Sequence, residues 1–168
     1  KYENNILTKI TQTEEEIKHL TFYDKNHLFY ITSTGISLLD ISTSKSRLIY
    51  PNDTKDFRQI ASLYYDEQLN RLWIGTGAAG LFYYDIIKKT LSPIPLKGFP
   101  KQPILAIKKD INNTLLIGID GQGIWNISEK GDKLLNIYKE DLNNPFSLRG
   151  DGVYDIFCDK SRNWVATY

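Results

Sequence analysis

Four aspartates recur along the chain at nearly even spacing and are the first candidates for chemistry. Carboxylates act as a general acid and base pair only where two of them converge on one substrate. Each of these four ends a short apolar stretch, and the regular recurrence places them on separate copies of one unit. We therefore predict that each accepts backbone hydrogen bonds in a tight turn. They are Asp24, Asp66, Asp110 and Asp159, spaced 42, 44 and 49 residues apart.

A second group of candidates lies mostly in the segments that connect the predicted strands. Polar side chains on such connections commonly bind ligands when a rigid scaffold positions them. Trp125 joins the group because the matching positions of other repeats hold Ser37 and Phe82, which makes its indole a candidate to stack on a sugar ring. Packing is the alternative role for Trp125, and ordinary surface or turn chemistry is the alternative for the others. The candidate ligand-binding residues are Asp56, Arg58, Gln59, Lys101, Gln102, Asp120, Gln122, Trp125, Arg149 and Asp151.

Other chemistry finds little support in the sequence. The two histidines, His19 and His27, and the single Cys158 form no cluster with metal-ligand spacing. The glycines between positions 75 and 80 lack the Gly-Lys-Ser/Thr of a phosphate-binding loop. No nucleophilic serine elbow or Ser/His/Asp set is present. The sequence thus predicts no cofactor, no metal site and no catalytic residues.

The composition is that of a globular protein rich in strand-forming residues. Of the 168 residues, 41% are hydrophobic, 24% are charged and 12% are aromatic. The net charge of +1 argues against a nucleic-acid partner. No apolar run approaches the roughly 18 residues of a membrane span. The absence of Met and of a signal peptide is typical of an interior piece of a longer protein.

The elements that position these residues follow from an internal repeat. The stretch from Leu72 to Asp85 reads as a strand, a glycine-rich turn and a second strand. Its turn glycine, Gly80, recurs as Gly35 and Gly123. Its first strand recurs as residues 28–31, 115–118 and 163–166.

A period near 44 with four short antiparallel strands is typical of a β-propeller blade. We therefore predict an all-β fold, a β-propeller fragment of about three and a half four-stranded blades that form an open arc. The blades span residues 17–50, 59–95, 104–139 and an incomplete 153–168. Residues 1–16 are predicted to hold the last strand of a preceding blade and a loop. The predicted strands are 17–23, 28–32, 36–40, 47–50, 59–65, 71–75, 81–85, 91–94, 104–108, 114–118, 123–127, 134–138, 153–158 and 163–167.

Two motifs resemble a named repeat. Residues 72–76 read Leu-Trp-Ile-Gly-Thr, followed by Gly80-Leu81 and Tyr84-Asp85. Residues 143–148 read Asn-Asn-Pro-Phe-Ser-Leu, followed by Val153, Ile156, Asp159 and residues 164–167. Both patterns resemble the two-component regulator propeller repeat, which occurs in the periplasmic sensor region of bacterial hybrid two-component systems. The resemblance is weaker in the first and third repeats.

The resemblance implies a function and a setting. It implies a non-catalytic, periplasmic ligand-sensing segment of a hybrid histidine kinase, which responds to an oligosaccharide or a related polymer breakdown product by rearrangement of propellers or dimer partners. The alternatives are a protein-interaction scaffold without a small ligand and, less favoured, a propeller-type glycan hydrolase or lyase. The expected partners are an oligosaccharide ligand, the remaining propeller blades and a second copy in a homodimer, with no nucleic-acid or membrane contact by this segment.

Overall fold

The computed structural model describes residues 15–51 and 60–168, together with two short strands near the N-terminus, Tyr2–Glu3 (β1) and Ile6–Leu7 (β2). Asp56, Arg58 and Gln59 lie outside the described residues. Strands β1 and β2 pair antiparallel with each other. Whether this region supplies the last strand of a preceding blade therefore stays a prediction.

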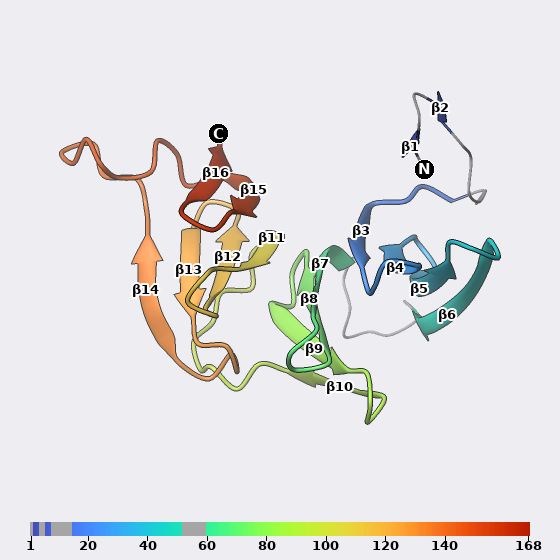
Figure 1. Ribbon diagram of the computed structural model, residues 1–168. Coiled ribbons are helices and arrows are strands. Elements are labelled where there is room, and N and C mark those ends of the chain that lie inside the picture. The colour runs from blue at the N-terminus through green and yellow to red at the C-terminus, as the bar shows by residue number, and fades with distance from the viewer. Residues whose placement is uncertain (1, 4–5, 8–14, 52–59) are drawn as a thin grey trace.

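The described chain folds into three four-stranded antiparallel sheets and a fourth sheet of two strands (Figure 1). In each sheet the strands pair in chain order. Blade 1 holds β3 (His19–Phe22), β4 (His27–Ile31), β5 (Gly35–Asp40) and β6 (Lys45–Pro51). Blade 2 holds β7 (Ile60–Asp66), β8 (Arg71–Thr76), β9 (Leu81–Asp85) and β10 (Thr90–Pro93). Blade 3 holds β11 (Ile104–Lys109), β12 (Leu115–Ile119), β13 (Gly123–Ile127) and β14 (Leu134–Tyr138), and blade 4 holds β15 (Val153–Cys158) and β16 (Asn163–Thr167).

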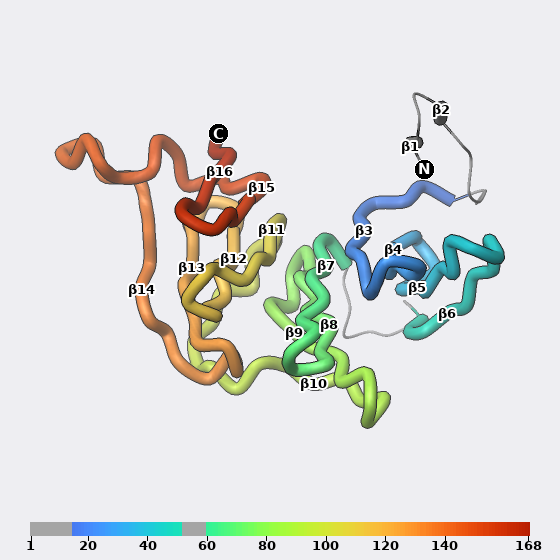
Figure 2. Tube along the Cα trace, in the orientation of Figure 1, coloured from blue at the N-terminus to red at the C-terminus, as the bar shows by residue number. Residues whose placement is uncertain are grey.

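The blades follow one another along an open arc. The first strands lie on the inner side and the last strands, β6, β10 and β14, on the outer side (Figures 1 and 2). The inner strands contact one another in order, β3 with β7, β7 with β11 and β11 with β15. This arrangement confirms the predicted all-β propeller fragment.

The core is divided among the interfaces between blades. One cluster joins blades 1 and 2 through residues such as Phe29 and Leu63, and a second joins blades 2 and 3 around the fully buried Trp73. A third joins blade 3 to the half-blade through Val153 and Ile156. Each sheet buries both faces only where it has a neighbour on each side, so the blades depend on one another for their core.

The turns follow the sequence prediction closely. The three turn glycines, Gly35, Gly80 and Gly123, adopt positive φ values of 142°, 89° and 71°. All four repeated aspartates accept backbone N–H bonds in the turn between the first and second strands. The donors are Asn26 and His27 for Asp24, Gln68 and Leu69 for Asp66, Asn112 and Thr114 for Asp110, and Ser161 and Arg162 for Asp159.

One repeat position was predicted one residue out of register. The aspartate spacing pairs Asp24 with Asp66, but in the sheets Phe22 pairs with Leu28 where Tyr65 pairs with Leu72. Asp24 therefore lies one residue beyond the position of Asp66. The turn after Asp24 is shorter, because β4 begins three residues later and β8 begins five residues after Asp66.

Gly75 and Gly118 occupy the same position of the second strand and allow the next blade to approach. A Cβ atom on Gly75 would lie 2.7 Å from Cγ2 and 2.8 Å from Cβ of Ile104, the first residue of β11. A Cβ atom on Gly118 would lie 2.7 Å from Cγ1 of Val153, the first residue of β15. Such distances are too short for real carbon contacts, so a side chain here would push the neighbouring blade away.

We expect Gly75→Ala to lower the free energy of unfolding by about 2 kcal/mol, because overpacking in a dense core typically costs 1–3 kcal/mol. Gly152→Ala is the matched control, since its nearest neighbours lie at 3.7 Å, an ordinary contact distance. Urea unfolding of both variants measures the difference. Equal stability of the two variants would contradict the close-approach role of Gly75.

Candidate functional site

Six of the predicted ligand-binding residues that the structure describes lie on one end of the blades, which we call the connector face: Lys101, Gln102, Asp120, Gln122, Arg149 and Asp151. It consists of the turns between the second and third strands, residues 32–34, 77–80 and 120–122, and the described connections between blades, residues 15–18, 94–103 and 139–152. These segments touch one another. At blade 1, for example, the Glu15 carboxylate accepts bonds from Ser33 Oγ (2.7 Å) and Thr34 N (3.1 Å).

Asp120, Gln122 and Asp151 come together where blade 3 meets blade 4. The Asp120 N–H donates to Pro103 O (2.9 Å), and Gln122 Oε1 accepts a bond from Lys139 Nζ (3.1 Å). Asp151 fixes the corner twice, because its Oδ1 accepts the Glu140 N–H (2.7 Å) and its carbonyl accepts the Gly123 N–H (2.9 Å). The result is a polar corner with two carboxylates and an amide on a hydrogen-bonded backbone.

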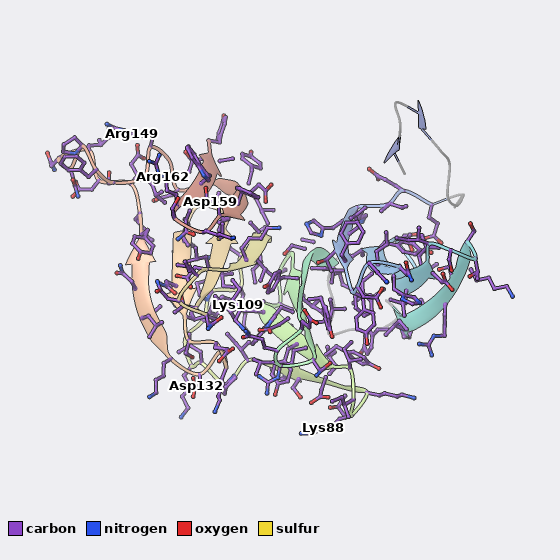
Figure 3. All side chains as sticks on the ribbon, viewed as in Figure 1. Lys88, Lys109, Asp132, Arg149, Asp159 and Arg162 are labelled. Carbon is purple, nitrogen blue, oxygen red and sulfur yellow. The ribbon has the colours of Figure 1, made fainter. Side chains whose placement is uncertain are left out.

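The remaining described candidates lie around this corner. Lys101 and Gln102 are exposed and directly precede Pro103, whose carbonyl binds Asp120. Arg149 is exposed on the connection between blades 3 and 4, and its Nη2 donates to Pro145 O (3.2 Å) (Figure 3). The structure therefore leaves these three side chains accessible beside the corner, and their ligand contacts stay predictions.

Trp125 is placed by packing. Its ring meets Phe99 edge-on at 5.4 Å between centroids, in the cluster that joins blades 2 and 3. Its Nε1 is buried and makes no hydrogen bond within the described structure. This position supports the packing role that the sequence left open, while stacking on a sugar stays a prediction.

The long connection predicted at residues 140–152 projects from the blades, but the sequence reasoning did not single out the apolar residues of its part 140–148, which carries the Asn-Asn-Pro-Phe-Ser-Leu motif (Figure 1). The loop is closed by Ser147, whose Oγ donates to Asp141 O (2.9 Å) and accepts the Asp141 N–H (2.9 Å). At its tip Leu142 is 88% exposed and Phe146 is 95% exposed. One signal in the sequence could have found it: Phe146 is a large apolar residue directly after Pro145, among Asn and Ser residues that are typical of turns.

A groove of about 650 Å³ lies between this loop, the outer strands of blade 3 and β16. Its floor is formed by Leu116 and Ile124, and Asn126 Oδ1 is buried there without a hydrogen-bond partner among the described residues. Arg162 and Asn163 bound it from the side of blade 4. Sequence reasoning did not predict this groove, because it depends on how the loop 140–148 and β16 pack beside blade 3.

The opposite end of the blades carries an ion cluster that the sequence also did not predict. Lys109 Nζ binds Asp66 Oδ2 (3.0 Å), Gln68 Oε1 (2.9 Å) and Glu129 Oε1 (2.7 Å), and so joins blade 2 to blade 3 (Figure 3). The side chains of Lys109 and Asp66 are only 8% and 1% exposed. Burial lowers the pKa of Lys109, but the bonds to Glu129 and Asp66 outweigh it and raise the pKa overall.

His19, on the inner strand β3, is a titratable group that the fold perturbs. Its Nδ1 accepts the Leu63 N–H at 3.4 Å, so the ring that makes this contact is neutral at that nitrogen. Burial lowers the pKa of His19, the charge of Lys108 on β11 lowers it further, and Asp155 on β15 opposes the shift.

Two kinds of feature are absent from the described residues. No group of three or more His, Cys, Asp or Glu side chains is placed to hold a metal ion in that part of the chain. Over the same residues, no helix is long and apolar enough to cross a membrane.

No protein-family profile matches the sequence, and no curated protein matches it. Solved structures, in contrast, align with most of the chain. Two crystal structures of the extracellular domain of BT4673 from B. thetaiotaomicron, named in one case a one-component and in the other a hybrid two-component system, align with TM-scores of 0.72 and 0.73. Each covers 90% of this chain at 24% identity. The chain shares the fold of these extracellular domains.

Other similar structures agree on the fold. The extracellular domain of BT3049, also named as a hybrid two-component system of B. thetaiotaomicron, aligns with a TM-score of 0.60 at 19% identity, over 90% of this chain and 25% of its own. An auxiliary nutrient binding protein from Bacteroides thetaiotaomicron aligns with a TM-score of 0.66 at 11% identity, over 90% of this chain and 36% of its own. This chain spans about a fifth of the length of the BT4673 domain, 20% in both structures.

We expect Lys109→Met to lower the free energy of unfolding by about 3–5 kcal/mol, because it leaves the buried Asp66 carboxylate without its cation. Glu129→Gln is the control, and we expect it to cost about 1 kcal/mol or less, since the Glu129 side chain is 35% exposed. Urea unfolding at neutral pH measures both. A Lys109→Met variant as stable as Glu129→Gln would show that the cluster does not hold the two blades together.

The lowered pKa of His19 makes stability depend on pH. In the folded chain His19 stays neutral to a lower pH than the ordinary value of 6.5, so below 6.5 the unfolded chain binds the extra proton. We therefore expect stability to fall as the pH drops from 6.5 through the folded pKa, and to be constant with respect to this group above 6.5. In the His19→Gln variant we expect this part of the dependence of stability on pH to disappear. The free energy of unfolding of both proteins, measured between pH 5 and 8, tests this. An unchanged slope in the variant would contradict the assignment.

Proposed function

We propose that this chain is a non-catalytic ligand-sensing segment of the extracytoplasmic part of a hybrid two-component histidine kinase. The observation that carries the proposal is the alignment with the BT4673 extracellular domain over 90% of the chain. The propeller repeat motifs at residues 72–85 and 143–167 support it independently, because they come from the sequence. Periplasmic location follows as part of the same proposal.

The proposed ligand is an oligosaccharide or a related polymer breakdown product. The polar corner at Asp120, Gln122 and Asp151 offers carboxylate and amide groups of the kind that bind sugar hydroxyls, and Arg149, Lys101 and Gln102 lie beside it. A nutrient-binding protein among the similar structures is consistent with this choice. No cofactor is required for such binding.

The proposed signal is a rearrangement between propeller segments or between two copies of the protein. Rigid-body movement suits this fold, because the blades are joined by packed interfaces and a bound ligand that contacts two segments favours one arrangement of them. The partners in this proposal are the remaining blades of a longer chain and a second copy in a homodimer.

One observation favours a second candidate, a scaffold that binds another protein. Leu142 and Phe146 stand almost fully exposed on the hydrogen-bonded loop 140–148. Large apolar side chains on a preorganised loop are typical anchors of protein interfaces.

The test is calorimetry of the complete extracellular domain against a panel of oligosaccharides. We expect one glycan class to bind, and Gln122→Ala or Arg149→Ala to weaken it about tenfold through a lost hydrogen bond to the ligand. Lys88→Ala is the matched control, since Lys88 is exposed in a turn at the opposite end of the blades (Figure 3).

Two results would overturn the glycan proposal. One is the absence of binding by any glycan. The other is a protein partner whose binding is lost in the Phe146→Ser variant and unchanged in the Gln122→Ala variant. That result would favour the scaffold.

A further inference from the structure

A pocket of about 350 Å³ lies between blade 1 and blade 2. Both blades have four paired strands, so the pocket belongs to a complete interface. It lies toward the end opposite the connector face, because it reaches Lys89 in the turn between β9 and β10. Its lining is mostly apolar and includes two cations: Tyr23, Phe29, Leu38 and Arg47 come from blade 1, and Tyr84 and Lys89 come from blade 2.

The register shows which side chains leave this space open. Phe29 of β4 pairs with Leu38 of β5, and in the next blade the same two positions hold a larger pair. That pair is Trp73 and Tyr83, whose rings pack 5.6 Å apart at the interface of blade 2 with blade 3. Blade 3 closes on the indole, since a Cβ atom on Gly131 would lie only 3.1 Å from Cη2 of Trp73. Blade 1 carries the smaller side chain at both positions, and the missing volume accounts for the pocket.

Arg47 and Lys89 are cations without an acidic partner. Arg47 lies beside Leu38, with which it pairs between β5 and β6. Both cations are exposed, and the ion pairs of the described residues involve neither of them. Lys88, in the same turn as Lys89, does have a partner, since its Nζ lies 3.8 Å from Asp85 Oδ2. The pocket therefore combines an apolar interior with unpaired positive charge, which fits an anion with an apolar body.

The rings that line the pocket favour an aromatic body. Tyr23 meets Phe29 edge-on, with 5.5 Å between the ring centroids. Tyr84 is 8% exposed, and burial raises the pKa of its hydroxyl although the charge of Arg47 opposes the shift. The phenol thus stays protonated at neutral pH and can donate a hydrogen bond. Another aromatic ring can pack on such walls through edge-on or offset contacts.

We propose that this pocket binds an aromatic carboxylate, with the ring between the two blades and the carboxylate bound by Arg47 and Lys89. The planar guanidinium of Arg47 can donate two parallel bonds to a carboxylate, and Lys89 adds a second positive charge. The ring occupies the space that the indole of Trp73 fills at the next interface, so a ring system of indole size is expected. This site is separate from the proposed oligosaccharide site, since it lies toward the other end of the blades and binds a different class of molecule.

The test is calorimetry of the full chain, with indole-3-acetate as the probe and its neutral analogue of equal size, indole-3-acetamide, as the control. We expect saturable binding of indole-3-acetate and roughly tenfold weaker binding of indole-3-acetamide, because the amide lacks the charge that the two cations recognise. Bound indole-3-acetate should also slow hydrogen exchange in β6 and in residues 86–89, since it joins the two blades. No binding, equal affinity for the two compounds, or protection only in other strands would overturn the proposal.

One double variant tests the shape of the pocket. Phe29→Trp with Leu38→Tyr copies the pair of blade 2 and should fill the pocket, so we expect a roughly tenfold loss of affinity for indole-3-acetate. Circular dichroism checks that the variant keeps the β fold. Unchanged affinity in the folded variant would overturn the proposal.

A single variant tests the charge and decides the matter alone if the double variant does not fold. Arg47→Gln changes an exposed side chain, and we expect roughly a tenfold loss for indole-3-acetate with less than about a twofold change for indole-3-acetamide. Lys88→Gln is the matched control, since Lys88 lies in the same turn as Lys89 but does not line the pocket, and its affinity should stay within about twofold of the parent. Equal affinities in Arg47→Gln and Lys88→Gln would overturn the proposal.

Discussion

The close approach of successive blades is the constraint on which the rest of the structure depends. It is made where Gly75 and Gly118 leave room for Ile104 and Val153, the first residues of the following inner strands. The paired residues of the inner strand are small as well, Ser62 and Ala106, and Ser62 Oγ donates to Ile104 O (2.7 Å). Because a side chain at the glycine would separate the blades, the buried clusters between them exist only while this position stays empty.

Within blades held this close together, the two ends differ in how much they vary from one blade to the next. At one end the four aspartates repeat one device, a carboxylate that accepts backbone N–H bonds. At Asp159 a side-chain bond from Trp164 adds to this device, and together with the bonds from Ser161 and Arg162 it lowers the pKa to about 2. At the other end the connections differ in length and sequence from blade to blade. The repeated aspartate turns therefore stabilise the same structure in every blade, whereas the variable connections of the connector face can carry a binding site.

The sequence predicted the strands, the turn glycines and the aspartate turns because each is a local feature repeated several times. It did not predict the Lys109 cluster, since Asp66 of blade 2 approaches Lys109 of blade 3 only after the two blades have packed. The alignment of Asp24 with Asp66 was one residue out, because the turn after Asp24 is shorter although both turns begin with an aspartate. For the candidate site, strand order alone predicted that Asp120, Gln122 and the long connection 140–152 lie on one face. The exposure of Phe146 on that connection, and the groove beside it, could be seen only in the folded chain.

The same packing rule explains why the two ends of the arc differ from its middle. Leu63 in blade 2 is 2% exposed, while Leu20, its counterpart in blade 1, is 48% exposed. Trp73 and Trp164 show the same contrast at the other end of the arc. Each blade gains its stability from its neighbours, so blades with one neighbour hold less buried area per strand. The connector face keeps its shape at the centre of the arc because separate buried clusters hold blade 2 to blade 1 and to blade 3.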